Sequence, residues 1–543
     1  MQGLIGPLKE LAEFEELCKN KKKDVGMIRV CGCVNSQKSH MMYALGDGCK
    51  YKVIACSSET KAKQIYEEYR FLDSNTYLYP AKDFLFYQAD IRSKELVKQR
   101  MEGIQAVLSG EPVTVVTSLD GFMDHLAPKE SIAEKVLKIQ NDSVLKLDEM
   151  AEKLSVIGYD REVQVEGPGQ FAVRGGILDI YPLTEELPVR IELWGDEVDS
   201  IRTFDVESQR SIENLMDIVI YPAVEFPQNG EKGVSFLDYF PPEDTILFLD
   251  EPVRLVERGQ NIEDEFMEAQ KKRLESGYDL EEEEAKIFPV TEILKKINCY
   301  SSIGFYALEM KCKGLEVRES YEIQAKSVNP YNNSFEMLTQ DLKRLKRNGY
   351  RVILLSGSRT RAKRLAEDLR DYNLSSYYSE DLDREVKPGE IMTAYGYIAE
   401  GYEYPMLKFT VIAESDIFGK RKKKKKRKTY EGRKIQSFSE LKPGDYVVHE
   451  NHGVGVYQGI EKIVVDKISK DYMKISYAQD GNLYIPATQL DLIQKYASAD
   501  AKKPKLNKLG TQEWNRTKTK VRGAVKEIAR DLVKLYAATQ EQD

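Results

Sequence analysis

The chain has 543 residues, which is too long for one hydrophobic core and predicts about three to five domains. Hydrophobic residues make up 41%, charged residues 31%, and the formal net charge is −8, a composition typical of globular proteins. No apolar run approaches the ~20 residues of a membrane helix, and no export signal is recognised, so we expect a cytoplasmic protein. The seven cysteines include no CxxC pair, which argues against a metal site and favours reduced thiols.

The first 157 residues alternate apolar runs with amphipathic helical patterns. The runs "MIRVCGCV", "YKVIACSS" and "PVTVVTS" predict strands, and "TKAKQIYEEYRFL" predicts a helix between two of them. This order is typical of βαβ units on a parallel sheet. Residues 1–157 are therefore predicted to be the first part of an α/β domain.

The segment "GCVNSQKS" follows the first predicted strand and resembles a phosphate-binding loop. Such loops follow the pattern G-x-x-x-x-G-K-[ST], in which the lysine contacts phosphate and the hydroxyl holds Mg²⁺. Gly32, Lys38 and Ser39 match the pattern, but Gln37 replaces the second glycine and would narrow the phosphate cradle. The segment is therefore a working site, a chance match or a decayed site, and the decayed site is favoured.

The pattern changes at residue 158. Residues 158–225 alternate apolar and polar positions between turn signals, which predicts an antiparallel, β-rich insert. Residues 226–331 return to α/β and are predicted to complete the first domain. Within them, "ILFLDEP" is a buried strand that ends in Asp250 and Glu251, which are placed as the acids of a second nucleotide motif.

The remainder divides into four segments. Residues 332–419 predict a small second α/β domain, and residues 420–437 a basic linker that begins with nine cations in succession. Such a run is usually solvated, and contact with nucleic acid is its alternative function. Residues 438–500 predict a compact β-barrel, in which "GVGVYQG" is interpreted as a turn and His449 and His452 as structural residues. Residues 501–543 predict a long helix.

These segments carry a family resemblance in two places. "GQFAVRGGILDIYP" and "PVRIELWGDEVDSIRTFD", between the loop and "LDEP", resemble the excision repair protein UvrB and, still more, the UvrB-like module of bacterial transcription-repair coupling factors. "LKPGDYVVHENHGVGVYQGI" and "YMKISYAQDGNLYIPATQLDLI" resemble the RNA-polymerase-interacting domain of those factors, a Tudor-like barrel shared with CarD-type regulators. The two matches occur in the order of the family.

The resemblance implies a fold and a nucleotide state. It implies a degenerate RecA/UvrB-like domain that has lost its ATPase, so no cofactor is expected here. In the family, ATP and Mg²⁺ serve a translocase motor that follows the barrel, and this chain is expected to be the adaptor half. The aromatic-rich hairpin with which UvrB probes damage is expected to be missing between residues 77 and 100.

The resemblance also implies a UvrA-binding surface on the insert. The family motif places it at Arg174, Arg190 and Trp194, where guanidinium groups can pair with carboxylates and an aromatic ring can anchor the contact. The alternative is that both arginines are solvated strand residues and Trp194 belongs to the core. On the first interpretation, alanine at both arginines removes UvrA binding without lowering the melting temperature.

In the barrel, the resemblance places a contact with the RNA polymerase β subunit at Ile463. We expect its strand, with Glu461, Lys462 and Val465 beside it, to pair with an edge strand of that subunit. The alternative is a core position. The implied function is an adaptor of transcription-coupled repair that binds RNA polymerase and UvrA, with DNA contacted by the full-length factor. A helicase-like ATPase with an atypical loop and a CarD-like transcription regulator are the alternatives.

Overall fold

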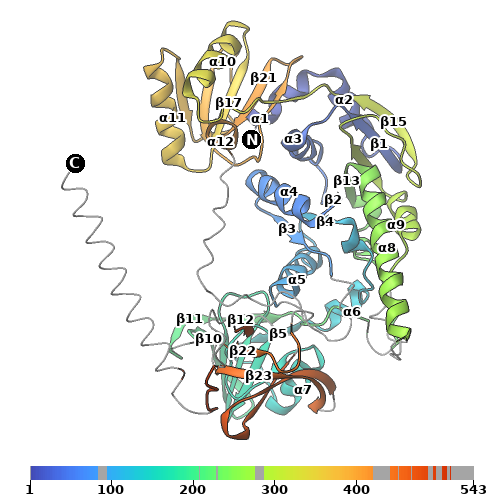
Figure 1. The fold of residues 1–543 in the computed structure, drawn as a ribbon, viewed down its shortest axis with the longest axis vertical. Coiled ribbons are helices and arrows are strands. Elements are labelled where there is room, and N and C mark those ends of the chain that lie inside the picture. Colours follow the sequence, from blue (N-terminus) through green and yellow to red (C-terminus); the bar gives the residue numbers. More distant parts are fainter. Residues whose placement is uncertain are drawn as a thin grey trace, which may run out of the picture. The chain divides into compact units, whose positions relative to one another are not determined.

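The computed structural model describes residues 2–82, 94–206, 208–227, 230–275, 287–419, 441–449, 452–465, 468–486, 493–496, 504–509 and 514 (Figure 1). The chain forms two compact units. The first comprises Met1–Leu85, Lys98–Lys138 and Val219–Lys425, and the second comprises Phe86–Val97, Ile139–Ile218 and Lys426–Asp543. Among the described residues, no helix combines the length and apolar content needed to cross a bilayer.

A seven-stranded sheet forms the centre of the first unit, with the strand order β15-β1-β14-β13-β2-β4-β3 and parallel pairing throughout. This confirms the predicted parallel α/β domain. The strands are β1 (Gly26–Cys31), β2 (Tyr51–Cys56), β3 (Thr76–Tyr79), β4 (Val113–Ser118), β13 (Thr245–Asp250), β14 (Ser301–Phe305) and β15 (Val317–Glu322).

The helices of this domain follow the apolar runs, as the sequence predicts. They include α3 (Asn35–Leu45), α4 (Glu59–Leu72), α5 (Lys94–Leu108), α8 (Pro252–Glu275) and α9 (Val290–Ile297). Helix α3 begins directly after the loop that follows β1. Strand β13, which is separated from β1 by β14, ends at Asp250. Because the carboxyl ends of parallel strands share one edge, the loop and the acids after β13 lie close together.

A second, mixed sheet belongs to the same unit, with the order β16-β20-β21-β17-β19-β18. Its strands are β16 (Lys326–Ser327), β17 (Arg351–Ser356), β18 (Ser376–Ser379), β19 (Ile391–Tyr395), β20 (Tyr402–Tyr404) and β21 (Phe409–Ala413). One face packs under α10 (Phe335–Arg347) and α11 (Arg359–Asp371) in a leucine-rich core. The other face contributes to the core that contains α3. The small α/β domain is therefore fused to the first one through the helix of the phosphate loop.

The β-rich insert forms a six-stranded sheet with the order β11-β10-β9-β8-β7-β6. The strands are β6 (Asp160–Arg161), β7 (Gln170–Arg174), β8 (Ile177–Tyr181), β9 (Val189–Trp194), β10 (Glu197–Phe204) and β11 (Ser211–Leu215). All pairs are antiparallel except β6 with β7. Two further strands, β5 (Leu137–Gln140) and β12 (Asp217–Ile220), pair with each other, and α7 (Leu147–Val156) precedes the sheet.

The predicted barrel is a five-stranded antiparallel sheet with the order β25-β24-β23-β22-β26. The strands are β22 (Tyr446–His449), β23 (Gly453–Val465), β24 (Ile468–Ser476), β25 (Asn482–Pro486) and β26 (Ile493–Lys495). One prediction is wrong here: "GVGVYQG" lies in β23 and is not a turn. A Cβ at Gly455 would lie 2.5 Å from Ile475 Cγ2, so this glycine allows close packing across the sheet. The basic run, most of the predicted terminal helix and residues 83–93, where the UvrB hairpin is predicted to be missing, lie outside the described residues.

Candidate functional sites

The loop after β1 contains a glycine in the left-handed region of backbone conformation. Gly32 adopts a φ of +79°, which favours glycine. A Cβ at this position would also lie 2.7 Å from the carbonyl oxygen of Ile323. The close approach of the chain after β15 therefore accounts for Gly32 without a phosphate.

Lys38 is paired with both acids at the end of β13. Its Nζ lies 2.8 Å from Asp250 Oδ1 and 2.6 Å from Glu251 Oε1, and the lysine side chain is only 6% exposed. Burial lowers the pKa of Lys38, but the two carboxylates outweigh it and raise the pKa overall. Glu251 is held in the left-handed region with a φ of +53° and also accepts from the N–H of Ala307. The structure thus brings the predicted lysine and acids together as a buried ion triad.

Ser39 is engaged by a carboxylate that the sequence did not single out. Its hydroxyl donates to Glu68 Oε2 at 2.5 Å, and the hydroxyl of Ser36 donates to Glu68 Oε1 at 2.6 Å. Glu68 comes from α4, is 1% exposed, and also accepts from Gln64 and from the N–H of Ala399. The hydroxyl that would hold Mg²⁺ therefore belongs to a buried network within the chain.

Gln37 stands at the position of the missing glycine, and its side chain makes two hydrogen bonds within the chain. It is fully buried at the start of α3, where its Oε1 accepts from the N–H of Val34 at 3.2 Å. Its Nε2 donates to the hydroxyl of Tyr404 at 3.1 Å, and the same hydroxyl lies 3.0 Å from Nδ1 of His40. Tyr404 belongs to the small α/β domain, so the replacement residue fastens that domain onto α3.

These contacts do not fit a bound nucleotide. A phosphate at this loop needs a lysine free to contact it, a free hydroxyl for Mg²⁺, and open N–H groups at the start of the helix. Here Lys38 and Ser39 are both bound to carboxylates. The loop at Glu400 also lies against the start of α3, since Glu400 bonds Asn35 and its N–H donates to Ser36.

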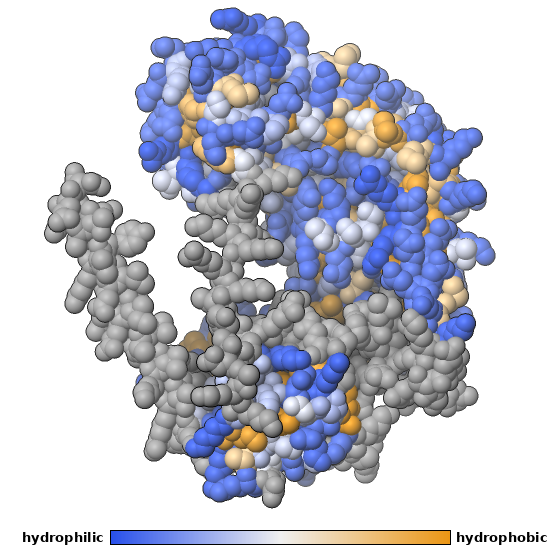
Figure 2. Space-filling model, viewed as in Figure 1, coloured by the Kyte–Doolittle hydropathy of each residue, from blue (hydrophilic) through white to orange (hydrophobic). Residues whose placement is uncertain are grey.

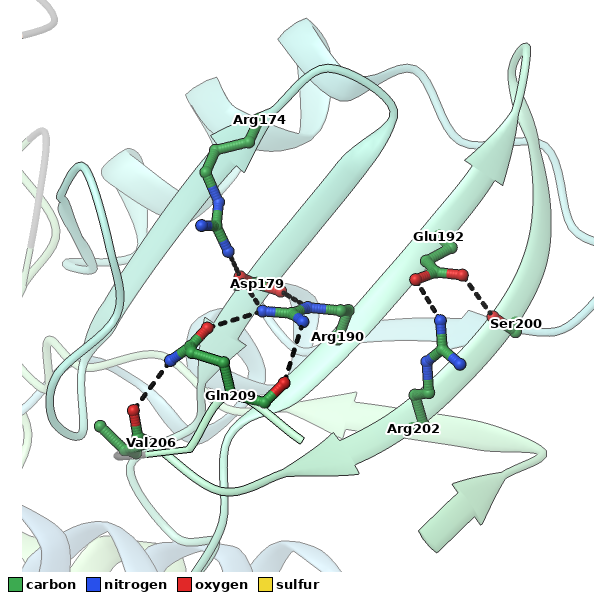
Figure 3. A network of polar contacts seen from close by, with 8 residues as sticks. All are labelled: Arg174, Asp179, Arg190, Glu192, Ser200, Arg202, Val206 and Gln209. Carbon is green, nitrogen blue, oxygen red and sulfur yellow. Dashed lines mark hydrogen bonds and ion pairs between the residues drawn. The ribbon is translucent and has the colours of Figure 1, made fainter. Parts of the chain in front are cut away.

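Arg174 and Arg190 in the insert converge on one buried carboxylate (Figure 3). Asp179 is 1% exposed and accepts from Nε and Nη2 of Arg190 at 2.7 and 2.9 Å, which is a bidentate pair. Nη2 of Arg174 donates to the same carboxylate at 2.5 Å. Hydrogen bonding to Asp179 is the main cause that raises the pKa of Arg190.

The two arginines differ in exposure. The side chain of Arg190 is 14% exposed, stacks over Phe204 at 4.5 Å and donates to Gln209. The side chain of Arg174 is 43% exposed. Arg190 therefore has a structural role in this sheet, and whether it also contacts UvrA stays a prediction. Because of these contacts, we now expect alanine at both positions to lower the melting temperature. Such a variant would leave a buried carboxylate without its cations.

Trp194 ends β9 and is 85% exposed. This excludes the alternative that it belongs to the core. The same sheet face carries Glu192, which accepts from Arg202 and Ser200 of β10. Asp179 was missed by the sequence reasoning, although a single acid in the otherwise apolar run "ILDIY" is a signal of a buried ion pair.

The candidate polymerase-binding strand is β23. Its first part, Gly453–Val456, pairs with β22, whereas Gly459–Val465 pairs with β24 alone among the described residues. One edge of the Gly459–Val465 segment thus has no ladder partner in the described part of the chain. Glu461 forms an exposed ion pair with Lys474 at 2.8 Å. The side chains of Lys462, Ile463 and Val465 lie outside the described residues, although their backbone belongs to the strand.

The two histidines near this strand are not part of a metal site in the described residues. His449 is 2% exposed, and its ring centroid lies 4.7 Å from that of His452. Across the described part of the chain, no group of three metal-binding side chains occurs. That both histidines are structural stays a prediction.

Two family models match the chain. Residues 137–226 match the UvrB interaction domain, and residues 441–497 match the CarD-like/TRCF RID domain. A solved structure of a hypothetical ATP-dependent RNA helicase from Sulfolobus tokodaii aligns with 72% of the chain and 82% of its own length. Its TM-score is 0.21 and its identity is 10%.

Curated relatives match over most of the chain. The transcription-repair-coupling factor of Bacillus subtilis is 30% identical over 98% of this chain and 50% of its own length. That of Staphylococcus haemolyticus is 28% identical over 85% of this chain and 44% of its own length. The chain thus spans about half the length of the curated relatives it matches. It belongs to the transcription-repair coupling factor family and corresponds to the N-terminal region, with the UvrB interaction domain and the RID domain.

Proposed function

We propose that this chain is an adaptor in transcription-coupled excision repair, with separate surfaces for UvrA and for the RNA polymerase β subunit. The observation that carries the proposal is the presence of both domains, the UvrB interaction domain and the RID domain, in one chain. The closed state of the phosphate loop supports a binding role without nucleotide turnover, since Lys38 is already neutralised by Asp250 and Glu251.

The UvrA surface is centred on Trp194 and Arg174. An exposed tryptophan and a part-exposed arginine in one sheet are typical hot-spot residues, because the ring buries a large area and the guanidinium pairs with a carboxylate. Arg190 donates to Asp179 and so holds in place the carboxylate that Arg174 also contacts. The same carboxylate thus orients Arg174 for the partner.

The polymerase surface is the edge of Gly459–Val465 in β23 that has no ladder partner among the described residues. A strand whose one side has no ladder partner in the described chain offers N–H and C=O groups to an incoming strand. Ile463, with Glu461, Lys462 and Val465, is the proposed contact within this edge. The pairing of Lys38 with Asp250 and Glu251 disfavours a helicase-like ATPase. The UvrB interaction domain disfavours a regulator that acts through the barrel alone.

The test of the UvrA surface is capture of purified UvrA by the full chain. Arg174→Ala combined with Trp194→Ala should reduce capture at least tenfold, because two exposed hot-spot residues are lost while the Asp179–Arg190 pair remains. Val163→Ala is the matched control, since Val163 is 88% exposed in the same domain. Undiminished capture by the double variant, or an equal loss in the control, would contradict the assignment.

The polymerase surface is tested with Ile463→Arg and the purified β subunit. We expect loss of β-subunit binding while thermal unfolding of the chain is unchanged. An unfolded RID domain would instead show that Ile463 is a core residue. Lys462→Glu gives a second variant that changes the charge of the same edge without removing an apolar side chain.

A further inference from the structure

Helix α11 of the small α/β domain carries an unusual distribution of charge. Its first six residues include four cations, Arg359, Arg361, Lys363 and Arg364, and its first turn has no acid. The positive end of the helix dipole opposes cations at these positions. Local helix stability therefore does not account for them.

Two of these cations lie over tyrosine rings. The guanidinium carbon of Arg359 is 5.8 Å from the ring centroid of Tyr395, and Nζ of Lys363 is 5.1 Å from that of Tyr378. Arg359 and Lys363 are four residues apart and share one face of the helix. The tyrosines come from β19 and β18, which are neighbours in the sheet. Cations and aromatic rings thus alternate along one surface.

The ring of Tyr395 is held in place but remains accessible. Phe71 at the end of α4 packs against it edge-on, with centroids 6.1 Å apart and an interplanar angle of 83°. Gly396 permits this contact, because a Cβ there would lie 2.6 Å from the Phe71 ring. Even so, Tyr395 is 45% exposed and Tyr397 nearby is 42% exposed. Fixed, exposed rings are suited to stacking.

The cations of this surface are largely available to a ligand. Within the described residues, Arg359 and Arg364 form no ion pair, and Arg361 is paired with Glu414. Lys363 lies 3.5 Å from Glu380, but both side chains are more than half exposed, so this pair is weak and easily exchanged. Figure 2 shows mainly hydrophilic side chains over the small α/β domain, where α10 and α11 lie in Figure 1.

We propose that this surface, formed by Arg359, Lys363, Tyr378 and Tyr395, binds single-stranded nucleic acid without sequence preference. Phosphates pair with the cations of α11, and a base stacks on the exposed ring of Tyr395. The single strand is favoured over a duplex because bases in a duplex have no free face to offer a ring. An acidic protein segment would use the cations but not the stacking, so the ring distinguishes the two ligands.

The test measures fluorescence anisotropy of a labelled 20-nucleotide oligo-dT with the full chain at ~50 mM salt, where electrostatic binding is strong. All proteins are compared with and without replacement of residues 420–428 by Gly and Ser, which removes the basic run. Arg359→Ala with Lys363→Ala should weaken binding about tenfold or more. It should also reduce the slope of log K against log salt by roughly 1.4, about 0.7 for each lost phosphate contact.

Two comparisons separate this surface from general charge effects. Lys343→Ala with Arg347→Ala removes two exposed cations from α10 of the same domain and should change the affinity less than twofold. Tyr395→Leu should weaken binding about fivefold to a hundredfold. Tyr395→Phe should bind as tightly as the parent chain, because it keeps the aromatic ring. Oligo-U should bind comparably and a 20-base-pair duplex more weakly.

The proposal is overturned by an equal effect of the α10 variant, by unchanged binding in Tyr395→Leu, or by a duplex that binds as tightly as oligo-dT. Loss of all binding on replacement of residues 420–428 would likewise assign the interaction to the basic run.

Discussion

At the scale of single residues, buried carboxylates determine what the conspicuous cations can do. Asp179 in the insert and Glu68 beside the phosphate loop are each 1% exposed and each bind several donors. A buried carboxylate requires such partners, because an unpaired charge away from water is costly. Arg190 and Ser39 are therefore committed within the chain, whereas Arg174 and Trp194 remain available on the surface.

Arg190→Ala tests this division. It removes the bidentate partner of a buried carboxylate and should lower the free energy of unfolding by about 2 kcal/mol. Arg174→Ala should cost less than about 1 kcal/mol, because its side chain is 43% exposed and Arg190 still satisfies Asp179. Urea denaturation of both variants decides the matter, and equal losses would contradict the assigned roles.

His40 gives a prediction for pH. Burial lowers its pKa from 6.5 to about 4, so the folded chain holds this histidine neutral. Nε2–H donates to the carbonyl of Leu4, and Nδ1 accepts from the hydroxyl of Tyr404. The unfolded state binds a proton at His40 below pH 6.5, whereas the folded state binds one only near pH 4. Stability therefore decreases as the pH is lowered from 6.5 to 4.

The free energy of unfolding is expected to decrease by about 3 kcal/mol as the pH falls from 7 to 4. His40→Gln should be less stable than the parent chain at pH 7, with a difference that narrows by that amount as the pH falls to 4. Equilibrium denaturation in a series of buffers measures both curves. Parallel curves would show that His40 is not the group responsible.

At the scale of elements, the sequence predicts the strands well and their junctions poorly. Buried runs such as "YRVILLSG" and "TILFLD" become β17 and β13, because a continuous apolar run fits a sheet covered on both faces. The bond between Gln37 and Tyr404 spans 367 residues, and no local pattern reports it. In the same way, Gly455 resembles a turn signal but permits close packing inside β23.

The candidate sites were predicted to a similar extent. Lys38, Asp250 and Glu251 were predicted as parts of one degenerate nucleotide site. The structure brings the three side chains into contact, because the edge of a parallel sheet gathers residues that follow its strands. The partners Glu68 and Asp179 were missed, since a carboxylate in a helix or a strand is more often solvated. Whether Arg174, Trp194 and Ile463 contact partners stays a prediction.

Restoring the glycine of the loop tests the account of α3. Gln37→Gly reproduces the G-x-x-x-x-G-K-S pattern, yet we expect no binding of Mg·ATP up to millimolar concentration, because Lys38 and Ser39 stay bound to carboxylates. Stability should fall by more than the ~1 kcal/mol cost of a helical glycine, since the bond to Tyr404 is lost as well.

Lys63→Gly is the matched control for helix propensity, as Lys63 lies exposed within α4. It should show only the cost of the glycine itself. Calorimetry with Mg·ATP and urea denaturation give both readouts. Micromolar ATP binding by Gln37→Gly would mean that the site is closed by the glutamine alone.

At the scale of the whole molecule, the first compact unit holds the loop that resembles a phosphate loop, whereas the surfaces proposed for partners lie on the insert and the RID domain. The small α/β domain shares a core with α3, so the loop that resembles a phosphate loop lies inside the first compact unit. We propose that each partner binds independently of the other and without a change at the loop that resembles a phosphate loop.

The most direct test is mass photometry of the chain mixed with UvrA and the polymerase β subunit under constant nucleotide conditions. The account predicts a three-component complex. Trp194→Ala should remove only UvrA from it, and Ile463→Arg should remove only the β subunit. Partners that exclude each other, or one substitution that releases both, would contradict the adaptor function.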